Sequence, residues 1–515
     1  MRGHTRRSAT AANRFGETLH VKQLLLFLLV VGWSSAPAVR GAEPAARARP
    51  NILLICVDDL KPILGCYGDR LTRSPHIDRL AARGILFERA YCNQAVCSPS
   101  RNALLTGLRP QTLGIYDLAT NFRVAAPQAI TLPQYFRQHG YRTASLGKVF
   151  HVGHDNHDDP ASWSVPSFRP GERAEAPVAA AVAPAPQERK KKSKAKRGPA
   201  YSADDVADSE YGDGKVADEA IRRLQAARAA PAEPFFLAVG FVKPHLPFVA
   251  PKKYWDLYQR ADFELASRRE LPAGAPSYAG QKSGELRNYR GIPAEGPLPD
   301  DLQRTLIHGY HAATSYTDAQ VGRVLAALDE TGLAANTIIV FWGDHGWHLG
   351  DHGMWCKHTN YEQAARIPLL LVAPGVTAPA SRTKAFAESV DIYPTLCELA
   401  GVPIPAGLDG SSLLSVARDP RAGGKDSALH VYPRGERIGR AIRTERYRLV
   451  EWKVPGSSPD TAEFELYDYE NDPLETQNLA DTEPETVAQL RALLAKHPEA
   501  RPQVDRPAEA VAPGS

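Results

Sequence analysis

A reactive side chain stands at the start of a predicted helix, in the segment around Cys97. Pro99 favours the first turn of a helix, and Ser98 precedes it as a candidate cap. Ser100 and Arg101 add hydroxyl and guanidinium donors within one turn of the thiol. Because a helix N-terminus also attracts negative charge, the segment suits an anion beside Cys97. The alternative is a buried cysteine that precedes an ordinary helix.

Acidic side chains follow two apolar segments of the chain. Asp58 and Asp59 come directly after one apolar run, and Asp344 and His345 follow another after a single glycine. Hard cations such as calcium prefer several oxygen ligands, which clustered carboxylates supply. One acidic pair alone would be read as a surface turn, but two at the ends of apolar runs favour a metal site. The imidazole among oxygen ligands leaves the identity of the metal open.

The apolar runs predict buried parallel strands. Residues 52–57, 234–242 and 337–342 are almost wholly apolar, which is typical of strands covered on both faces. Helical patterns lie between and around them, at residues 77–83, 132–139, 216–229 and 308–331. This alternation predicts an α/β fold. Since sites in such sheets gather at the carboxyl ends of strands, the acidic pairs and His245, which follows the second run, could meet in one crevice.

Composition divides the remainder of the chain. Residues 1–38 are typical of an export signal, because basic residues precede an apolar stretch too short to span a bilayer. The main domain is predicted over residues 46–425, interrupted at 170–200 by a basic insertion that we expect to be disordered. Short strand patterns predict a smaller C-terminal α+β subdomain over 426–505, followed by a disordered tail at 506–515.

Charge and cysteine content limit the possible partners. The 62 basic and 58 acidic side chains give a net charge of +4, which does not indicate nucleic acid binding. No segment after the signal has the length of a membrane span, so we expect export to the periplasm or the extracellular space without a stable span. Six cysteines are too few for a disulfide scaffold in 515 residues, although one or two bridges remain open.

The segment VCSPSRNALLTG at residues 96–107 matches the C-x-P-S-R and L-T-G signature of formylglycine-dependent sulfatases, and the chain resembles this family, most of all its iduronate-2-sulfatases. The resemblance implies an alkaline-phosphatase-like sandwich with a large mixed, mostly parallel sheet flanked by helices. It also implies a short antiparallel sheet in the C-terminal subdomain. The other segments that carry the resemblance lie at residues 57–60, 64–68, 147–151, 243–248, 343–357 and 466–479.

The resemblance also implies a cofactor and a modification. A formylglycine-generating enzyme or an anaerobic sulfatase-maturating enzyme would convert Cys97 to formylglycine. One hydroxyl of the aldehyde hydrate would attack sulfur, and the other would let the sulfated intermediate collapse. His345 stands where many sulfatases have asparagine, but iduronate-2-sulfatases have histidine there. One calcium ion per chain would be held by Asp58, Asp59, Cys97, Asp344 and His345.

The remaining implied roles concern charge and proton transfer. Lys148 and Lys357 would bind the sulfate, and Arg101 would hold the hydrate. His151 would act as a base, and His245 would protonate the departing alcohol. Four further histidines could line the same pocket, namely His154, His157, His348 and His352.

The sequence therefore predicts hydrolysis of sulfate esters, on a sulfated sugar or polysaccharide. Two alternatives stay open. One is a phosphate or phosphonate ester hydrolase of the same superfamily, although those enzymes typically use serine or threonine and two zinc ions. The other is a carbohydrate-binding homologue without catalysis. The loops that would read the sugar carry no motif, so the linkage is left undetermined.

Overall fold

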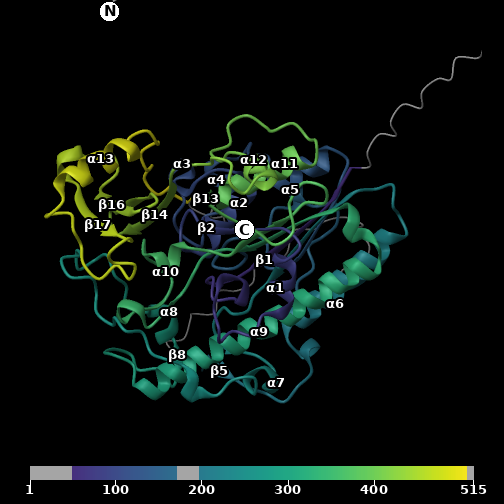
Figure 1. The fold of residues 1–515 in the computed structure, drawn as a ribbon, viewed down its shortest axis with the longest axis horizontal. Coiled ribbons are helices and arrows are strands. Elements are labelled where there is room, and N and C mark those ends of the chain that lie inside the picture. The colour runs from purple at the N-terminus through teal and green to yellow at the C-terminus, as the bar shows by residue number, and fades with distance from the viewer. Residues whose placement is uncertain (1–48, 171–195, 507–515) are drawn as a thin grey trace, which may run out of the picture. The chain divides into compact units, whose positions relative to one another are not determined.

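The computed structural model describes residues 49–170 and 196–506 (Figure 1). The export signal predicted over residues 1–38 lies outside the described residues, as do most of the basic insertion and of the C-terminal tail. Within the described ranges, no helix combines the length and the apolar composition that crossing a membrane requires.

A seven-stranded sheet forms the centre of the main domain, in the strand order β13-β2-β12-β9-β1-β6-β3. β12 runs antiparallel to both of its neighbours, and the other pairs are parallel. The predicted mixed, mostly parallel sheet is therefore confirmed. Its strands are β1 (Asn51–Val57), β2 (Ile85–Tyr91), β3 (Arg142–Gly147), β6 (Phe235–Phe241), β9 (Thr337–Gly343), β12 (Leu369–Val372) and β13 (Ser381–Glu388).

The three strands predicted from apolar runs are neighbours at the centre of this sheet. β1 lies between β6 and β9, and every residue of the three strands is buried. Val57 pairs with Phe241 on one side and with Gly343 on the other, so the three strands end at the same level. The residues that follow them are therefore brought to one edge of the sheet, as the sequence predicted.

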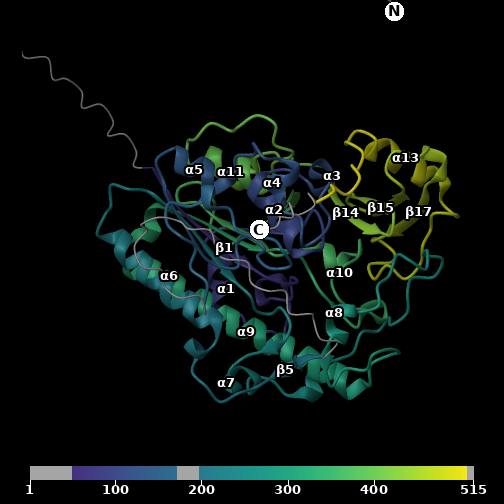
Figure 2. The ribbon, with the colours of Figure 1, turned by 180° about the vertical axis from the view of Figure 1, so that it is seen from behind.

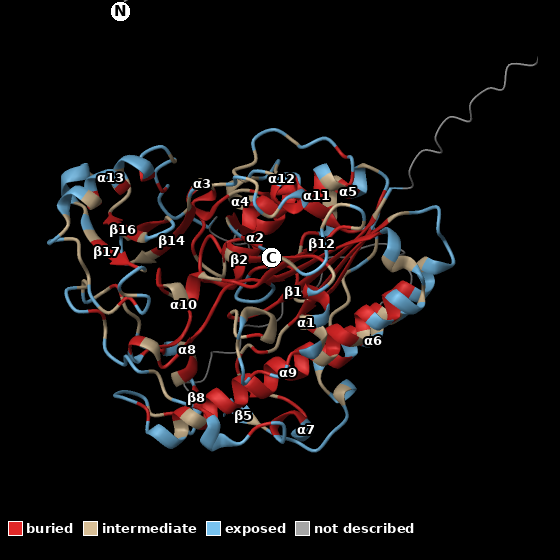
Figure 3. Cartoon of the chain, in the orientation of Figure 1, coloured by how far each residue is buried: buried red, intermediate tan, exposed pale blue. Residues whose placement is uncertain are grey.

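Helices cover both faces of the sheet (Figures 1 and 2). On one face, Leu53 and Ile55 of β1 pack with the apolar stripes of α1 (Pro75–Ala81), α6 (Gly212–Arg228) and α9 (Asp300–Glu330). On the other face, Ile52 and Leu54 pack with α2 (Cys97–Thr106), α5 (Leu132–Gln138) and α11 (Ile392–Leu399). Figure 3 shows this buried interior in red. Successive strand residues thus point to opposite faces, and each fully buried aliphatic side chain contributes about 1.5–3 kcal/mol.

Helix α9 is longer than the sequence pattern predicted. The helix was predicted to begin near residue 308, but it begins at Asp300, directly after Pro299. Asp300 and Asp301 lie in its first turn, where carboxylates interact favourably with the helix dipole. The prediction placed the start too late, since Leu302, Leu306 and Ile307 already carry the apolar period in the first two turns.

Short elements occupy the loops between these layers. The short helices are α3 (Pro110–Leu113), α4 (Phe122–Ala125), α7 (Lys252–Trp255), α8 (Gly284–Arg287), α10 (Glu362–Ala365) and α12 (Leu414–Arg418). The short strands are β4 (Arg197–Pro199), β5 (Tyr201–Ser202), β7 (Phe248–Val249), β8 (Tyr289–Arg290), β10 (His348–Leu349) and β11 (Trp355–Cys356).

The end of the basic insertion differs from the prediction. Strand β4 lies inside the range 170–200 that was expected to be disordered, and it pairs with β8. Ala200 is buried, and the Lys196 ammonium donates to the carbonyl of Ile292 at 2.6 Å. These contacts with distant segments order a stretch whose composition alone predicts disorder.

The C-terminal segment forms a four-stranded antiparallel sheet, drawn in yellow-green and yellow in Figure 1. Helix α13 (Pro484–Leu494) covers it, with Leu490 and Leu494 packed on Leu449 and Leu466. The short antiparallel sheet that was predicted is confirmed. Its strands are β14 (Ala428–Arg434), β15 (Arg437–Arg443), β16 (Tyr447–Lys453) and β17 (Glu463–Asp468).

The six cysteines all lie within the described residues and are all free thiols. The one or two disulfide bridges that the sequence left open are therefore not formed. The fold depends on packing and on buried ion pairs instead.

A buried carboxylate connects the central sheet with the C-terminal sheet. Glu388, at the end of β13, pairs with Arg109 at 2.8 Å and with Lys425, and it accepts a hydrogen bond from the backbone N–H of Leu429 at 3.2 Å. Burial opposes its charge, but Lys425 and then Arg109 hold the pKa of Glu388 below its ordinary value. The ionised carboxylate therefore stabilises the folded chain.

Replacing Glu388 by glutamine should destabilise the protein by about 3–5 kcal/mol at pH 7, because the buried Arg109 guanidinium loses its carboxylate partner and Lys425 keeps only Asp391. The pKa of Glu388 is depressed in the folded state, so its contribution is present above the unfolded pKa of about 4.3 and is lost as the pH falls below it. Urea unfolding at several pH values measures the difference.

The matched control is Glu436→Gln, since that side chain is exposed and its loss should change stability by less than about 0.5 kcal/mol. A Glu388→Gln variant as stable as the control at pH 7 would contradict the structural role of this carboxylate.

Candidate active site

Buried carboxylates meet where β1 and β9 end. Asp58 and Asp59 follow β1, Asp344 and His345 follow β9, and all four side chains are 0 % exposed. The backbone N–H of Asp344 donates to the carbonyl of Val57 at 3.0 Å, and that of Asp59 donates to Asp344 Oδ1 at 2.9 Å. The parallel register of the two strands thus places three acidic groups side by side.

Helix α2 brings Cys97 to this cluster. The helix begins at Cys97, every residue of it is buried, and the thiol is 2 % exposed. The expected cap by Ser98 is wrong, because Val96 is the N-cap and Ser98 Oγ instead accepts a hydrogen bond from Asn156 at 3.0 Å. Ser100 Oγ donates to the backbone carbonyl of Asp344, which ties the first turn of the helix to the end of β9.

Arg101 joins two of the carboxylates. Its guanidinium donates to Asp58 Oδ1 at 3.1 Å and to Asp344 Oδ2 at 3.0 Å, and it is 0 % exposed. It also donates to the backbone carbonyls of Lys148 and Val149. The guanidinium thus braces the strand ends, although the family resemblance implied a contact with the group at position 97.

Two ammonium groups flank the thiol. Lys148 Nζ and Lys357 Nζ each lie 3.6 Å from Cys97 Sγ. Lys148 also binds Asp58, and Lys357 donates to Asp59 Oδ1 at 2.8 Å. Burial disfavours both charges, but these carboxylates raise the pKa of each lysine above its ordinary value. An anion bound at position 97 would therefore meet two permanent positive charges.

His345 faces the same space through its unprotonated nitrogen. Nδ1 lies 3.1 Å from the carbonyl of Gly346, which can only accept, so we assign the proton to Nδ1. Nε2 lies 3.4 Å from both Cys97 Sγ and Asp59 Oδ1. Burial, and then the charge of Lys357, hold the pKa of His345 well below its ordinary range. The neutral ring therefore presents a lone pair to the cluster.

This donor set suits a divalent cation. Ligand atoms of Asp58, Asp59, Cys97 and His345 all lie within 4.8 Å of one another, and Asp59 Oδ2 has no hydrogen-bond partner among residues 49–170 and 196–506. Burial, and then the neighbouring Asp58, raise the pKa of Asp344 well above its ordinary value, so its charge is disfavoured both by loss of water and by a second carboxylate. A hard cation would relieve that repulsion and satisfy the orphaned oxygen.

Two histidines approach the cluster from the neighbouring strands. His245, beyond β6, has Nε2 at 3.9 Å from Asp59 Oδ2. His151, beyond β3, is buried and contacts His154 with 3.1 Å between ring nitrogens. Burial, and then Lys148, lower the pKa of His151 to about 3, so its ring is neutral. A cavity of about 500 Å³ opens here, lined among others by Lys148, Phe150, His151, His154, Tyr211, Lys243 and His245.

The other predicted histidines make different contacts. His348 bonds to Thr359 at 2.9 Å, and His352 lies against Tyr361 with ring centroids 5.1 Å apart. The backbone carbonyl of His157 accepts a hydrogen bond from the Asn121 side chain at 3.1 Å. Of the four weaker candidates, His154 is the one that lines the cavity beside His151 and His245.

Glu285 is a site residue that the sequence did not indicate. It lies on the short helix α8, with Oε1 3.0 Å from His245 Nε2 and Oε2 3.3 Å from Lys357 Nζ. Glu285 belongs to no motif, and the segment around it is polar and irregular. The contacts come from folding of a long loop onto the strand ends, for which the sequence carries no local signal.

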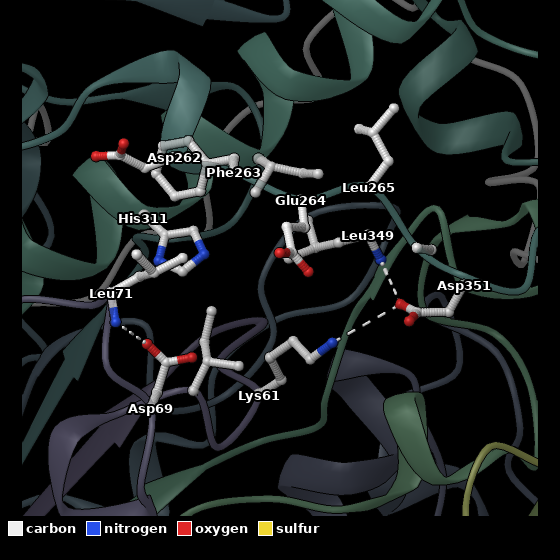
Figure 4. A pocket seen from close by; sticks show the side chains of 13 residues that line it. Lys61, Asp69, Leu71, Asp262, Phe263, Glu264, Leu265, His311, Leu349 and Asp351 are labelled. Atoms are coloured by element: carbon white, nitrogen blue, oxygen red, sulfur yellow. Dashed lines mark hydrogen bonds and ion pairs between the residues drawn. The ribbon is translucent and has the colours of Figure 1, made fainter.

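A second hollow, of about 420 Å³, lies apart from these residues (Figure 4). Lys61 points toward Asp351 across it, with 3.8 Å between the charged atoms, and Asp69 accepts from the backbone N–H of Leu71 at 2.9 Å. Neither the predicted catalytic residues nor the predicted metal ligands line this hollow. The chemistry is therefore assigned to the cluster around Cys97.

Comparison with known proteins gives the family. The family model described as Sulfatase matches residues 50–402, and the model of the N-sulphoglucosamine sulphohydrolase C-terminal region matches residues 350–500. The chain belongs to the sulfatase family. It is therefore a sulfuric ester hydrolase, and the predicted enzyme class is confirmed.

Two curated relatives of this sulfatase are similar over nearly their whole length. The iduronate 2-sulfatase of Mus musculus is 36 % identical, with 89 % of this chain and 96 % of the relative covered. That of Homo sapiens is also 36 % identical, with 87 % and 94 % covered. The resemblance to iduronate-2-sulfatases that the motifs indicated is thus confirmed.

Solved structures share the fold of this sulfatase. One in complex with its substrate D-glucosamine-2-N,6-O-disulfate aligns with a TM-score of 0.69 at 22 % identity and covers 87 % of this chain and 98 % of that one. The phosphonate monoester hydrolase of Agrobacterium radiobacter aligns with the same score and identity and covers 87 % and 95 %. At this identity the matches establish the architecture alone, which is the one predicted.

Proposed function

We propose that this sulfatase hydrolyses sulfate esters of a sulfated sugar or polysaccharide, with a nucleophile formed from Cys97 and a calcium ion at the acidic cluster. The observation that carries the proposal is the position of Cys97 Sγ, 3.6 Å from two lysine ammonium groups and 3.4 Å from His345. The similarity to enzymes named iduronate 2-sulfatase favours a 2-O-sulfated uronic acid as substrate.

Calcium would be held by the carboxylates of Asp58, Asp59 and Asp344 and by His345 Nε2, beside position 97. Bound there, the ion would act as a Lewis acid that polarises the sulfate and favours the ionised form of the nucleophile. Carboxylate oxygens are the ligands that calcium prefers, and one imidazole nitrogen is compatible with them. Arg101 would hold Asp58 and Asp344 in place while the ion binds.

Formylglycine at position 97 would supply a hydrate hydroxyl as the nucleophile toward sulfur. In the folded chain the Cys97 thiol is 2 % exposed, and burial raises its pKa well above the ordinary value. A thiol so buried is beyond the reach of a modifying enzyme. Conversion by a formylglycine-generating or anaerobic sulfatase-maturating enzyme would therefore precede folding, in agreement with an exported chain and the signal proposed over residues 1–38.

The protein's own side chains would stabilise the charge that develops on the sulfate. Lys148 and Lys357 lie on two sides of position 97, and both remain charged because each is paired with a buried carboxylate. Their ammonium groups would bind sulfate oxygens and offset the negative charge that develops on them. The neutral ring of His151 would accept a proton from the hydrate hydroxyl at position 97.

His245 would protonate the leaving group. When the bond between sulfur and the bridging oxygen breaks, its electron pair stays on the oxygen, and the alkoxide of a sugar is a poor leaving group. A proton from Nε2 of His245 would let it depart as a neutral alcohol, and solvent would return the proton to the ring. The ring lies at the cavity beside Asp59, where a substrate could reach it.

The modification is tested on protein purified from its native host. A peptide mass spectrum over Cys97 should show the aldehyde in place of the thiol, and Cys97→Ala should lower turnover by about 10³-fold or more without a change in thermal unfolding. An unmodified thiol in every molecule of an active sample would refute the formylglycine proposal.

Calcium binding has a readout that does not depend on turnover. Excess calcium should raise the melting temperature by several degrees, since a ligand at about 100 times its Kd stabilises by about 2.7 kcal/mol. Asp344→Asn should lose most of this rise because it removes one charged ligand. The exposed Glu264→Gln is the matched control and should keep it. If calcium leaves the melting temperature of the wild-type protein unchanged, the proposed calcium site is excluded.

The substrate is tested with a panel of sulfated oligosaccharides. The highest kcat/KM is expected on a 2-O-sulfated uronic acid. Failure on every such compound would remove that substrate assignment while leaving the sulfatase activity intact.

The panel should include a phosphate and a phosphonate monoester, because an enzyme with the same fold is named phosphonate monoester hydrolase. Faster turnover of these than of any sulfate ester would favour the alternative hydrolase.

A further inference from the structure

We propose that Arg169 is a specificity-determining residue that binds a second anionic group of the substrate, next to the sulfate that is cleaved. The inference deepens the proposed function, on which it rests, because it adds a charge requirement to the substrate class. The second group would be the carboxylate of a uronic acid or a further sulfate ester. A guanidinium can bind either oxyanion through two oxygens.

Main-chain pairing places Arg169 at the edge of the sheet where the proposed catalytic groups lie. The backbone N–H of Gly147 donates to the carbonyl of Phe168 at 2.8 Å, and Leu146 and Phe168 form a parallel bridge. The segment that ends in Arg169 therefore runs along β3 in the same direction as that strand. Lys148 comes directly after β3, so the two cations follow neighbouring extended segments.

The Arg169 side chain lies between two hollows. It lines the cavity of about 500 Å³ that is also lined by Lys148 and His151. It also lines a neighbouring hollow of about 380 Å³, together with Asp158 and Trp163. Because a cavity of about 500 Å³ is within the usual size of small-molecule sites, Arg169 forms part of the wall of a space that can hold a sugar.

Asp158 holds Arg169 from the side of the smaller hollow. Asp158 Oδ2 lies 2.9 Å from Arg169 Nη2. The carboxylate is itself fixed, because the indole N–H of Trp163 donates to Oδ1 at 3.2 Å and the Ser167 hydroxyl donates to Oδ2. Asp158 lines the smaller hollow and not the cavity. A guanidinium has five N–H donors, so it can contact a carboxylate on one side and a ligand on another.

The charged side chains around the cavity favour an anionic ligand. Lys148, Arg169 and Lys243 line it, and Asp213 is the only acidic residue in the described part of the chain that does so. Asp213 accepts hydrogen bonds from the backbone N–H groups of Val242 and Lys243, at 2.9 and 2.7 Å. Main-chain donors thus already engage that carboxylate. The cavity wall carries more positive charge than one sulfate requires.

Lys243 is less suited than Arg169 to a second anion. Its ammonium donates to the carbonyls of His245 and Pro247 at 2.7 and 2.8 Å, which holds the loop after β6 in place. The cleaved sulfate already has two lysines beside position 97. Of the cations that line the cavity, Arg169 is therefore the one that we assign to the second anion.

The ion pair with Asp158 does not by itself account for Arg169. The two side chains are 24 % and 17 % exposed, and an ion pair in contact with solvent contributes little to stability. A charge-assisted bond from Arg169 to the substrate would contribute more. Its loss should lower kcat/KM by about 10–100-fold for a substrate with the second anion and should leave a substrate without it almost unaffected.

The test compares Arg169→Gln with wild type, both purified with position 97 converted. One substrate is a 2-O-sulfated uronic acid glycoside, and the other is its carboxyl-reduced derivative, in which a primary alcohol replaces the carboxylate. The variant should lose about 10–100-fold in kcat/KM on the first and less than about 3-fold on the second. The loss should lie mainly in KM, because the proposal gives Arg169 no contact with the cleaved sulfate.

A third substrate distinguishes the two sources of the second anion. It is a carboxyl-reduced disaccharide with a further sulfate on the neighbouring sugar. A loss confined to the uronic acid assigns Arg169 to the carboxylate, and a loss confined to the disulfated compound assigns it to the second sulfate. Either result supports the proposal.

Two variants serve as controls. Arg228→Gln removes an exposed arginine at the end of α6 (Figure 1), whereas Gly212 at the start of that helix lines the cavity. It should keep wild-type activity on all three substrates. Arg169→Lys keeps the charge without the planar fork and should recover part of the lost activity. Thermal unfolding verifies that each variant is folded.

Equal losses of Arg169→Gln on the esters with and without the second anion would overturn the proposal, because a structural role would affect them alike. So would wild type with the same kcat/KM on all three, or a preferred substrate in the oligosaccharide panel that carries no second anion. Wild type that hydrolyses no sulfate ester would instead refute the proposed function.

Discussion

The site depends on one buried guanidinium held between two carboxylates. Arg101, fully excluded from solvent, binds Asp58 at the end of β1 and Asp344 at the end of β9. It lies one turn from Cys97, so the same ion pairs place helix α2 against the sheet edge. Without this cation, Asp344 would lose its ion pair and only Lys148 would offset the neighbouring charge of Asp58, at a cost of several kcal/mol. Two of the proposed metal ligands, Asp58 and Asp344, are held in place by this arrangement.

Charge balance explains how such a cluster can be buried and still bind ions. Asp58, Asp59, Asp344 and Glu285 contact Arg101, Lys148 and Lys357, so three positive charges offset most of the negative charge of the cluster. A divalent cation at the carboxylates and an anionic sulfate at the lysines would add opposite charges to adjacent parts of the cluster. Each would offset part of the field of the other, which favours joint binding of metal and substrate.

Local patterns predicted much of the fold and part of the site. The strands at 52–57, 234–242 and 337–342 were predictable because strands covered on both faces are apolar throughout, and their ends did converge. Local patterns did not predict the first turns of α9 or the order near β4. The order near β4 depends on pairing with a distant strand. The first turns of α9 do carry apolar residues at helical spacing, Leu302, Leu306 and Ile307, so that start was placed too late.

The sequence by itself determined which residues could form the site. These are a cysteine in a family signature, acidic pairs after apolar strands, and lysines and histidines that could bind an anion. These are short-range properties, set by residue type and spacing. Only the tertiary structure decided the contacts, such as Arg101 on Asp344 and Glu285 on His245. These partners are 243 and 40 residues apart in the chain. Contacts over such separations depend on sheet register and loop packing, which no local pattern of residues encodes.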